Sequence, residues 1–265
     1  FFFSLFSHGW SALPPFTLRE PGILGRTQKL REGTIVRFDV REGTGKLLIN
    51  TYDEISAPQQ IEVGSIVAHC LSFQHDVQPF YETIRGYGNY AWVEPIGAGR
   101  MLVSPTIWED LAKTLLTTNT TWAMTISMVS RLTTLGDAAP GGEHTFPTPE
   151  QVAVLDPDAF NAHIRAGYRG AYLHALATAL ATGQLEVRYW DDPSLPSAEI
   201  YTTLKRIKGF GDYAAGAMLR LLGRFDQLGL DSVCRAMFAQ RYNGGAAATD
   251  REIAAYYAPF GEWKG

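Results

Sequence analysis

Hydrophobic and polar positions alternate with a period of two over the first part of the chain. The alternation is clearest over residues 31–40 and 46–53, which are separated by a glycine-containing turn at 42–45. It predicts half-buried antiparallel strands, because successive side chains of a strand point to opposite faces. The apolar run over residues 61–70 is expected to add a third strand. Residues 1–75 are therefore predicted to form an N-terminal antiparallel β-domain.

From residue 76 onward, the apolar spacing becomes that of amphipathic helices. The best-marked helix covers residues 105–116, with Ser104 as its cap and Pro105 in its first turn. Pro- and Gly-rich stretches at 137–149 and 191–196 predict loops. The sequence therefore predicts an α+β protein with a helical core over residues 76–265. The other helices are expected at 79–84, 122–132, 157–164 and 171–181.

Residues 199–223 contain two helical apolar runs on either side of the turn Lys208-Gly209-Phe210-Gly211. Glycines allow the backbone to approach another surface closely, and they leave N–H groups exposed just before a helix. The start of a helix attracts anions, and phosphate is the anion we expect here. A side chain at Gly209 or Gly211 is expected to block this approach and to strain the backbone.

The hairpin resembles the helix-hairpin-helix of the HhH-GPD superfamily of DNA glycosylases, and the interval from Gly211 to Asp231 matches the superfamily's spacing. Residues 104–121 and 166–173 resemble segments of the 8-oxoguanine DNA glycosylases. The resemblance covers roughly residues 77–265. It implies a two-subdomain helical core behind an antiparallel sheet, and double-stranded DNA with a damaged base as the partner.

Asp231 is the catalytic residue that the resemblance implies. A glycosylase flips the damaged nucleotide out of the duplex and breaks its N-glycosidic bond, which develops positive charge on the sugar. A fixed carboxylate stabilises that charge and can orient the attacking water. The local sequence also predicts that Asp231 is the N-cap of a helix starting at Ser232. The two roles are compatible.

Tyr213 stands where superfamily members that also nick the strand carry a nucleophilic lysine. Because tyrosine cannot form an imine with the sugar, the resemblance implies a monofunctional enzyme that uses water. Tyr213, Ala217 and Ser232 are expected to line the base pocket, although simple packing at the helix start would also explain Tyr213. An alkylated purine is the expected substrate, as for 3-methyladenine DNA glycosylase II. An oxidised purine and a non-catalytic damage sensor are the alternatives.

DNA contacts are expected from Gly209, Gly211 and Lys208, and from the turn Thr118-Asn119-Thr120. By resemblance, Asn119 would enter the space left by the flipped nucleotide, whereas a plain helix–helix turn is the other interpretation. Lys113 is expected to be solvated or to face DNA. The resemblance also implies a structural K⁺ or Na⁺ bound by the backbone carbonyls of Lys205, Ile207 and Phe210.

Composition narrows the classes of protein further. With 46% hydrophobic and 19% charged residues the chain is typical of globular proteins, and its net charge of −4 argues against extensive wrapping by nucleic acid. Two cysteines cannot ligate a four-cysteine iron–sulfur cluster, and the histidines lack zinc-site spacing. The opening FFFSLF is too short to cross a bilayer. We therefore expect a cytoplasmic monomer, nucleoid-associated if bacterial, that requires no cofactor.

Overall fold

The structure is a computed structural model that describes residues 1–20 and 22–265. Its contacts divide the chain into two compact units, each made of two segments. Unit 1 comprises Phe1–Asp76 and Ile96–Val187, and unit 2 comprises Val77–Pro95 and Arg188–Gly265. These groupings describe packing, so the predicted domain boundary at residue 75 stays a prediction.

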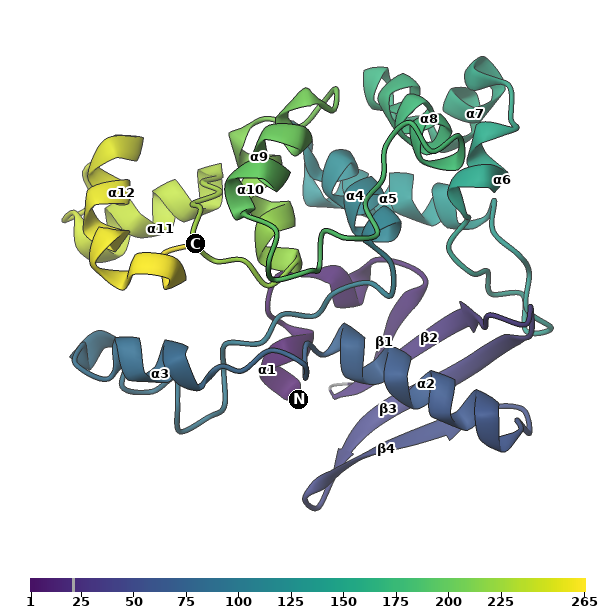
Figure 1. The fold of residues 1–265 in the computed structure, drawn as a ribbon, viewed down its shortest axis with the longest axis horizontal. Helices are drawn as coiled ribbons and strands as arrows, with labels where there is room; N and C mark the ends of the chain where they lie inside the picture. Colours follow the sequence, from purple (N-terminus) through teal and green to yellow (C-terminus); the bar gives the residue numbers. More distant parts are fainter. Residues whose placement is uncertain (21) are drawn as a thin grey trace. The chain divides into compact units, whose positions relative to one another are not determined.

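Unit 1 contains a four-stranded antiparallel sheet with strand order β1-β2-β3-β4 (Figure 1). The alternation of buried and exposed positions in β3 places Val36, Phe38 and Val40 in the core. The predicted sheet is thus confirmed, while β1 and β2 lay outside the predicted strands. The strands are β1 Phe16–Glu20, β2 Ile23–Lys29, β3 Ile35–Gly43 and β4 Lys46–Thr51, preceded by α1 Phe2–Leu5 and the 3₁₀ turn η1 Trp10–Ala12.

The predicted strand over residues 61–70 is wrong, because this segment belongs to helix α2, Ala57–Cys70. Ser56 and Gln59 form a reciprocal capping box at its start, with a proline in the first turn. Its buried residues Val63, Val67 and Cys70 have helical spacing. The helix covers one face of the sheet (Figure 1), and the capping signal at residue 56 outweighs the β-branched composition of the run.

In the rest of unit 1 the helices predicted at 122–132, 157–164 and 171–181 are confirmed, although the last begins at Tyr168, and the short helix Pro149–Ala153 was not predicted. The predicted helix at 105–116 is α4, but its N-cap is Thr106, whose hydroxyl accepts the Glu109 N–H. Ser104 instead donates its backbone N–H to the Asp110 carboxylate. The helices are α4 Ile107–Thr117, α5 Trp122–Thr133, α6 Pro149–Ala153, α7 Pro157–Ile164 and α8 Tyr168–Ala181.

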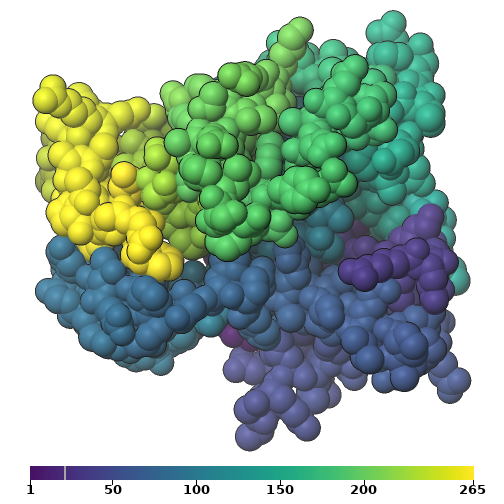
Figure 2. All heavy atoms as spheres, viewed as in Figure 1, coloured from purple at the N-terminus to yellow at the C-terminus, as the bar shows by residue number. Residues whose placement is uncertain are grey.

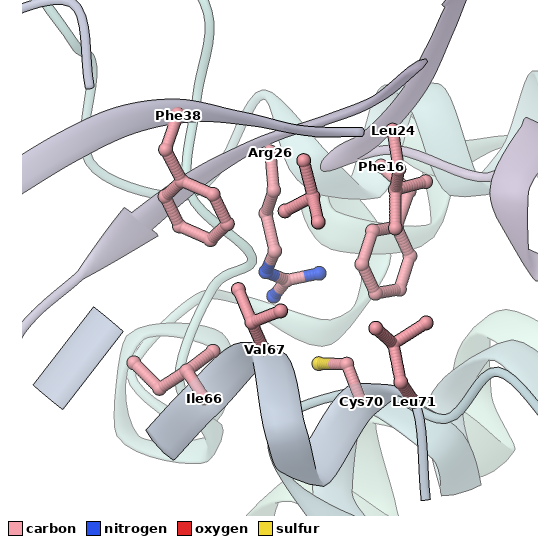
Figure 3. A pocket seen from close by; sticks show the side chains of 9 residues that line it. Phe16, Leu24, Arg26, Phe38, Ile66, Val67, Cys70 and Leu71 are labelled. Carbon is pink, nitrogen blue, oxygen red and sulfur yellow. The ribbon is translucent and has the colours of Figure 1, made fainter. Parts of the chain in front are cut away.

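A buried ionic cluster joins β2 to α4. The Arg26 guanidinium lies 2.7 Å from a Glu109 oxygen, and Lys113 Nζ lies 2.7 Å from the other carboxylate oxygen. Lys113 is fully buried, so the expectation of a solvated or DNA-facing lysine is wrong. Arg26 also borders a cavity of about 10 Å³ between the sheet and α2 (Figure 3), which holds at most one water.

Unit 2 combines a short upstream segment with the C-terminal part of the chain. Phe260 is buried against Tyr87 and Tyr90, with ring centroids 4.7 and 5.5 Å apart. The space-filling view shows the C-terminal segment (yellow) directly against the blue segment that contains α3 (Figure 2). The helices are α3 Gln78–Ile84, α9 Ser197–Arg206, α10 Asp212–Leu221, α11 Ser232–Tyr242 and α12 Asp250–Tyr257, with 3₁₀ turns η2 Gly88–Tyr90 and η3 Ala258–Trp263.

None of the helices in residues 1–20 and 22–265 combines the length and apolarity that crossing a membrane requires. Over the same residues, no three His, Cys, Asp or Glu side chains are grouped so that they could hold a metal ion.

Candidate active site

The predicted hairpin is present, with α9 and α10 joined by residues 207–211. Gly209 has a φ of +93°, a left-handed conformation that favours glycine. Gly211 has an ordinary extended backbone (φ −84°), and a Cβ placed on it would meet nothing within 4 Å. The expected backbone strain is therefore wrong for Gly211. No side chain caps α10, so its first N–H groups are left for another acceptor.

Charged groups surround the hairpin turn. Asp212, the first residue of α10, accepts hydrogen bonds from Lys205 Nζ at 2.6 Å and from the Tyr201 hydroxyl at 2.7 Å, and these two bonds lower the pKa of its carboxyl. Lys205 is therefore paired within the protein, while the side chain of Lys208 is exposed. Lys208 is the better placed of the two lysines for an external phosphate.

Asp231 is the N-cap of α11, as its local sequence predicts. Its Oδ1 accepts the backbone N–H of Cys234 at 2.6 Å, and the residue is half-buried. A carboxylate that accepts a backbone N–H at a helix N-terminus is fixed in direction. Asp231 thus meets the geometric requirement of a carboxylate that stabilises positive charge, and its catalytic role stays a prediction.

Two glycines determine where the chain enters Asp231. A Cβ on Gly216 of α10 would lie 2.6 Å from the Cα of Gly229, and a Cβ on Gly229 would lie 2.9 Å from the Ala217 nitrogen. The loop before Asp231 therefore packs backbone to backbone on α10. Sequence reasoning missed this contact, although a glycine inside a predicted helix is a signal for it.

Of the three residues expected to line a base pocket, two lie in α10 and the third directly follows Asp231 in the sequence. Tyr213 and Ala217 are both half-buried and are one helical turn apart, so they share a face of α10. Arg220 continues the same face one turn further on, and sequence reasoning missed it. Ser232 is exposed at the first position of α11. In unit 2 the structure thus places Tyr213 and Ala217 on the helix that supports the Asp231 loop.

The turn Thr118-Asn119-Thr120 belongs to unit 1. Asn119 is exposed and has a left-handed backbone (φ +46°), which asparagine tolerates better than most residues. Buried Arg169 donates hydrogen bonds to the carbonyls of Thr118 at 2.7 Å and Asn119 at 2.6 Å. The Asn119 amide donates to the Tyr168 hydroxyl at 3.4 Å. Arg169 therefore fixes the shape of this turn and presents Asn119 outward.

No family model matches the sequence, and no curated protein matches it either. Solved structures match at high coverage and low identity. They include a 3-methyladenine DNA glycosylase from Archaeoglobus fulgidus (TM-score 0.74, 19% identity, 99% of this chain and 89% of that chain). An 8-oxoguanine glycosylase/lyase from Clostridium acetobutylicum matches with a TM-score of 0.70, 14% identity and 96% coverage of both chains.

A third structure, MBOgg1 solved with a low-affinity DNA ligand, has a TM-score of 0.71 and 19% identity over 94% of both chains. The two classes of glycosylase are thus similarly close to this chain. Identities this low show the fold alone. The chain therefore has the fold shared by the 8-oxoguanine and 3-methyladenine DNA glycosylases: an N-terminal antiparallel sheet followed by helices that include a helix-hairpin-helix.

Proposed function

We propose that this protein is a DNA N-glycosylase of base excision repair, acting on a damaged purine flipped out of double-stranded DNA. The observation that carries the proposal is Asp231, a helix-capping carboxylate held at 2.6 Å by a backbone N–H and reached through a loop packed on the hairpin's second helix. The shared fold supports the same activity, since the similar solved structures are those of DNA glycosylases.

In this reaction Asp231 would face the sugar of the flipped nucleotide. Breaking the N-glycosidic bond leaves the electron pair on the departing base and builds positive charge at C1′ of the sugar. The fixed carboxylate stabilises that charge and orients a water, which adds to C1′ and passes a proton to the carboxylate. Loss of one such preorganised electrostatic group typically costs a factor of about 100 or more in rate.

Tyr213 supports a monofunctional enzyme. Its position at the start of α10 is the one that the resemblance assigns to a nucleophilic lysine, and a phenol cannot form an imine with C1′. Lys113, a lysine of unit 1, is fully buried in an ion pair with Glu109. We therefore predict that borohydride will not trap the protein on damaged DNA and that product strands will stay intact until alkali is added. Efficient trapping would contradict the monofunctional assignment.

An alkylated purine is the substrate that we propose first, because a positively charged alkylpurine leaves readily without strong acid catalysis. The half-buried ring of Tyr213 is suited to stacking on such a base. An oxidised purine is the second candidate, and the observation that favours it is the outward Asn119 turn fixed by Arg169. A panel of duplexes, each with one lesion, followed by alkaline cleavage distinguishes the two.

The hairpin would hold the DNA backbone. Gly209, Gly211 and Lys208 offer backbone N–H groups and one exposed ammonium to phosphates. The carbonyls of Lys205, Ile207 and Phe210 would hold a K⁺ or Na⁺ that stiffens the turn. Lys205 and Ile207 lie at the end of α9, where helix carbonyls lack intrahelical partners, and the Ile207 carbonyl also accepts the Phe210 N–H at 3.0 Å.

The decisive test is Asp231→Asn. Asparagine keeps a capping oxygen but removes the charge, so excision should fall about a hundredfold or more while lesion binding persists. Asp156→Asn is the matched control, because Asp156 caps α7 in the same way in unit 1 and should not affect excision. If Asp231→Asn excises at the wild-type rate, Asp231 is only the N-cap of α11 and has no catalytic role. Lesion binding by the wild type without any excision would favour the damage sensor.

A further inference from the structure

Arg220 lies against the backbone that leads into Asp231. Its Nη2 donates to the Gly229 carbonyl at 3.5 Å, and a Cβ built on Gly229 would come within 2.9 Å of its Nη1. The residue is half-buried at the end of the α10 face that begins with Tyr213. Its guanidinium therefore packs two residues before the carboxylate that the proposed reaction uses.

Arg220 lies among groups that can carry negative charge, and this determines what its own positive charge can do. Burial lowers the pKa of Arg220, while the nearby acidic groups of Cys234, Tyr213 and Asp231 favour its charged form. Arg235 of α11 also faces Asp231 and Cys234, but it is held by Asp250 through hydrogen bonds of 2.7 and 2.9 Å. Among the described residues, Arg220 forms no ion pair of its own that would neutralise it.

We propose that Arg220 is a positioning residue for Asp231: it fixes the Gly229 carbonyl and places a positive charge behind the carboxylate. This inference rests on the proposed function, since it assigns Arg220 to the same site. The positive charge interacts favourably with the Asp231 carboxylate, and the contact with the Gly229 carbonyl keeps the loop on α10. A methionine at 220 would fill similar space but supply neither effect.

Cys234 provides a reporter of this charge arrangement that does not depend on catalysis. Cys234 is exposed enough to react with a reagent in solution. Partial desolvation and the hydrogen-bonded Asp231 carboxylate raise the pKa of its thiol, whereas the charge of Arg220 opposes this increase. The only other cysteine, Cys70, is buried, and burial raises its pKa to about 12. Alkylation by iodoacetamide at increasing pH therefore reports on Cys234.

The alkylation experiment compares the wild type with variants at three positions. Arg220→Met should move the pH midpoint of Cys234 alkylation upward by about half a unit or more, because a neighbouring cation is lost. Arg220→Lys should stay near the wild type, and Asp231→Asn should move the midpoint downward. Arg224→Met is the control, since Arg224 donates to the carbonyls of residues 190, 192 and 195 and should leave the midpoint unchanged.

The excision experiment then follows the consequence for the proposed reaction. In Arg220→Met the excision rate at neutral pH should fall about tenfold, and Arg220→Lys should recover much of that rate. An alkylation midpoint and an excision rate that both match the wild type would overturn the role of Arg220. Absence of excision by the wild type would instead overturn the proposed function, and the alkylation midpoint would still decide whether Arg220 faces Asp231.

Discussion

Asp110 and Glu109 are neighbours in α4, yet their surroundings push their pKa values in opposite directions. Burial alone would raise the pKa of Glu109, but the ion pairs with Arg26 and Lys113 outweigh it and lower that pKa to about 2. Burial raises the pKa of Asp110 to about 7, against the opposing hydrogen bonds from Ser104 and Trp10. The sequence predicts only that acidic residues favour the start of a helix. Their different environments depend on partners from distant segments.

This difference predicts a pH dependence of stability. Between pH 5 and pH 7 an unfolded Asp110 has lost its proton while the folded protein keeps it, so the free energy of unfolding should fall as pH rises. Asp110→Asn should abolish this contribution, changing the pH 5 to pH 8 difference by about 2 kcal/mol. Urea unfolding of both proteins at the two pH values measures it. Glu109 contributes equally at both, because its folded and unfolded pKa values lie below 5. Equal pH differences would mean that the hydrogen bonds keep Asp110 ionised.

At the scale of single elements, prediction succeeded where caps and periodicity agree. Helix α7 has its predicted bounds because Asp156 caps it and a proline opens it. The hairpin likewise follows from its glycines and flanking apolar runs. Helix α2 was mistaken for a strand because its β-branched residues were weighed above the capping box at Ser56. The contact of Gly216 with Gly229 could not be predicted, since it joins a helix to a loop whose course has no local pattern.

The hairpin as a phosphate clamp leads to a prediction about Gly211→Val. Since the backbone at Gly211 is extended and its Cβ position is open, valine should leave the fold intact and obstruct only an approaching phosphate. Affinity should fall for damaged and undamaged duplex alike, because phosphate contacts carry no base information. The slope of log K against log[salt] should shrink by about 1 for each phosphate lost. Salt titrations after circular dichroism measure this, with Gly86→Val as the control at another open glycine of unit 2. If affinity and salt slope are unchanged in Gly211→Val, the hairpin does not contact the DNA backbone.

At the scale of the whole molecule, residues 77–95 pack with residues 188–265, although residues 96–187 separate the two segments along the chain. Sequence patterns indicated helices in both segments but not which of them pack together, because aromatic contacts such as Phe260 with Tyr87 leave no periodic signal. A boundary at residue 75 was instead expected to separate a sheet from one continuous helical core. The contact-based division predicts that residues 77–95 and 188–265 unfold together, whereas the boundary at residue 75 predicts that residues 76–265 unfold together.

Phe260→Ala distinguishes them. Removing a buried aromatic ring should cost about 3 kcal/mol, and the loss should fall on unit 2. Amide hydrogen exchange should therefore accelerate in residues 77–95 and 188–265 together, while the sheet and α4 keep their protection. Phe160→Ala, at another buried ring in α7 of unit 1, should have the reverse pattern. If Phe260→Ala accelerates exchange throughout residues 76–265, the helical part is one cooperative domain.

The contact between Gly216 and Gly229 also determines which sequences can preserve the site. Any larger residue at either position adds a carbon where another backbone already lies, at 2.6 Å in one case and 2.9 Å in the other. A saturation library selected for repair would therefore lose nearly every substitution at both positions, although neither glycine has a side chain that could take part in chemistry. Intolerance at these positions would reflect the tight backbone packing of the loop that leads to Asp231. In a list of positions ordered by mutational sensitivity, the two glycines would consequently rank as high as Asp231, although their role is purely steric.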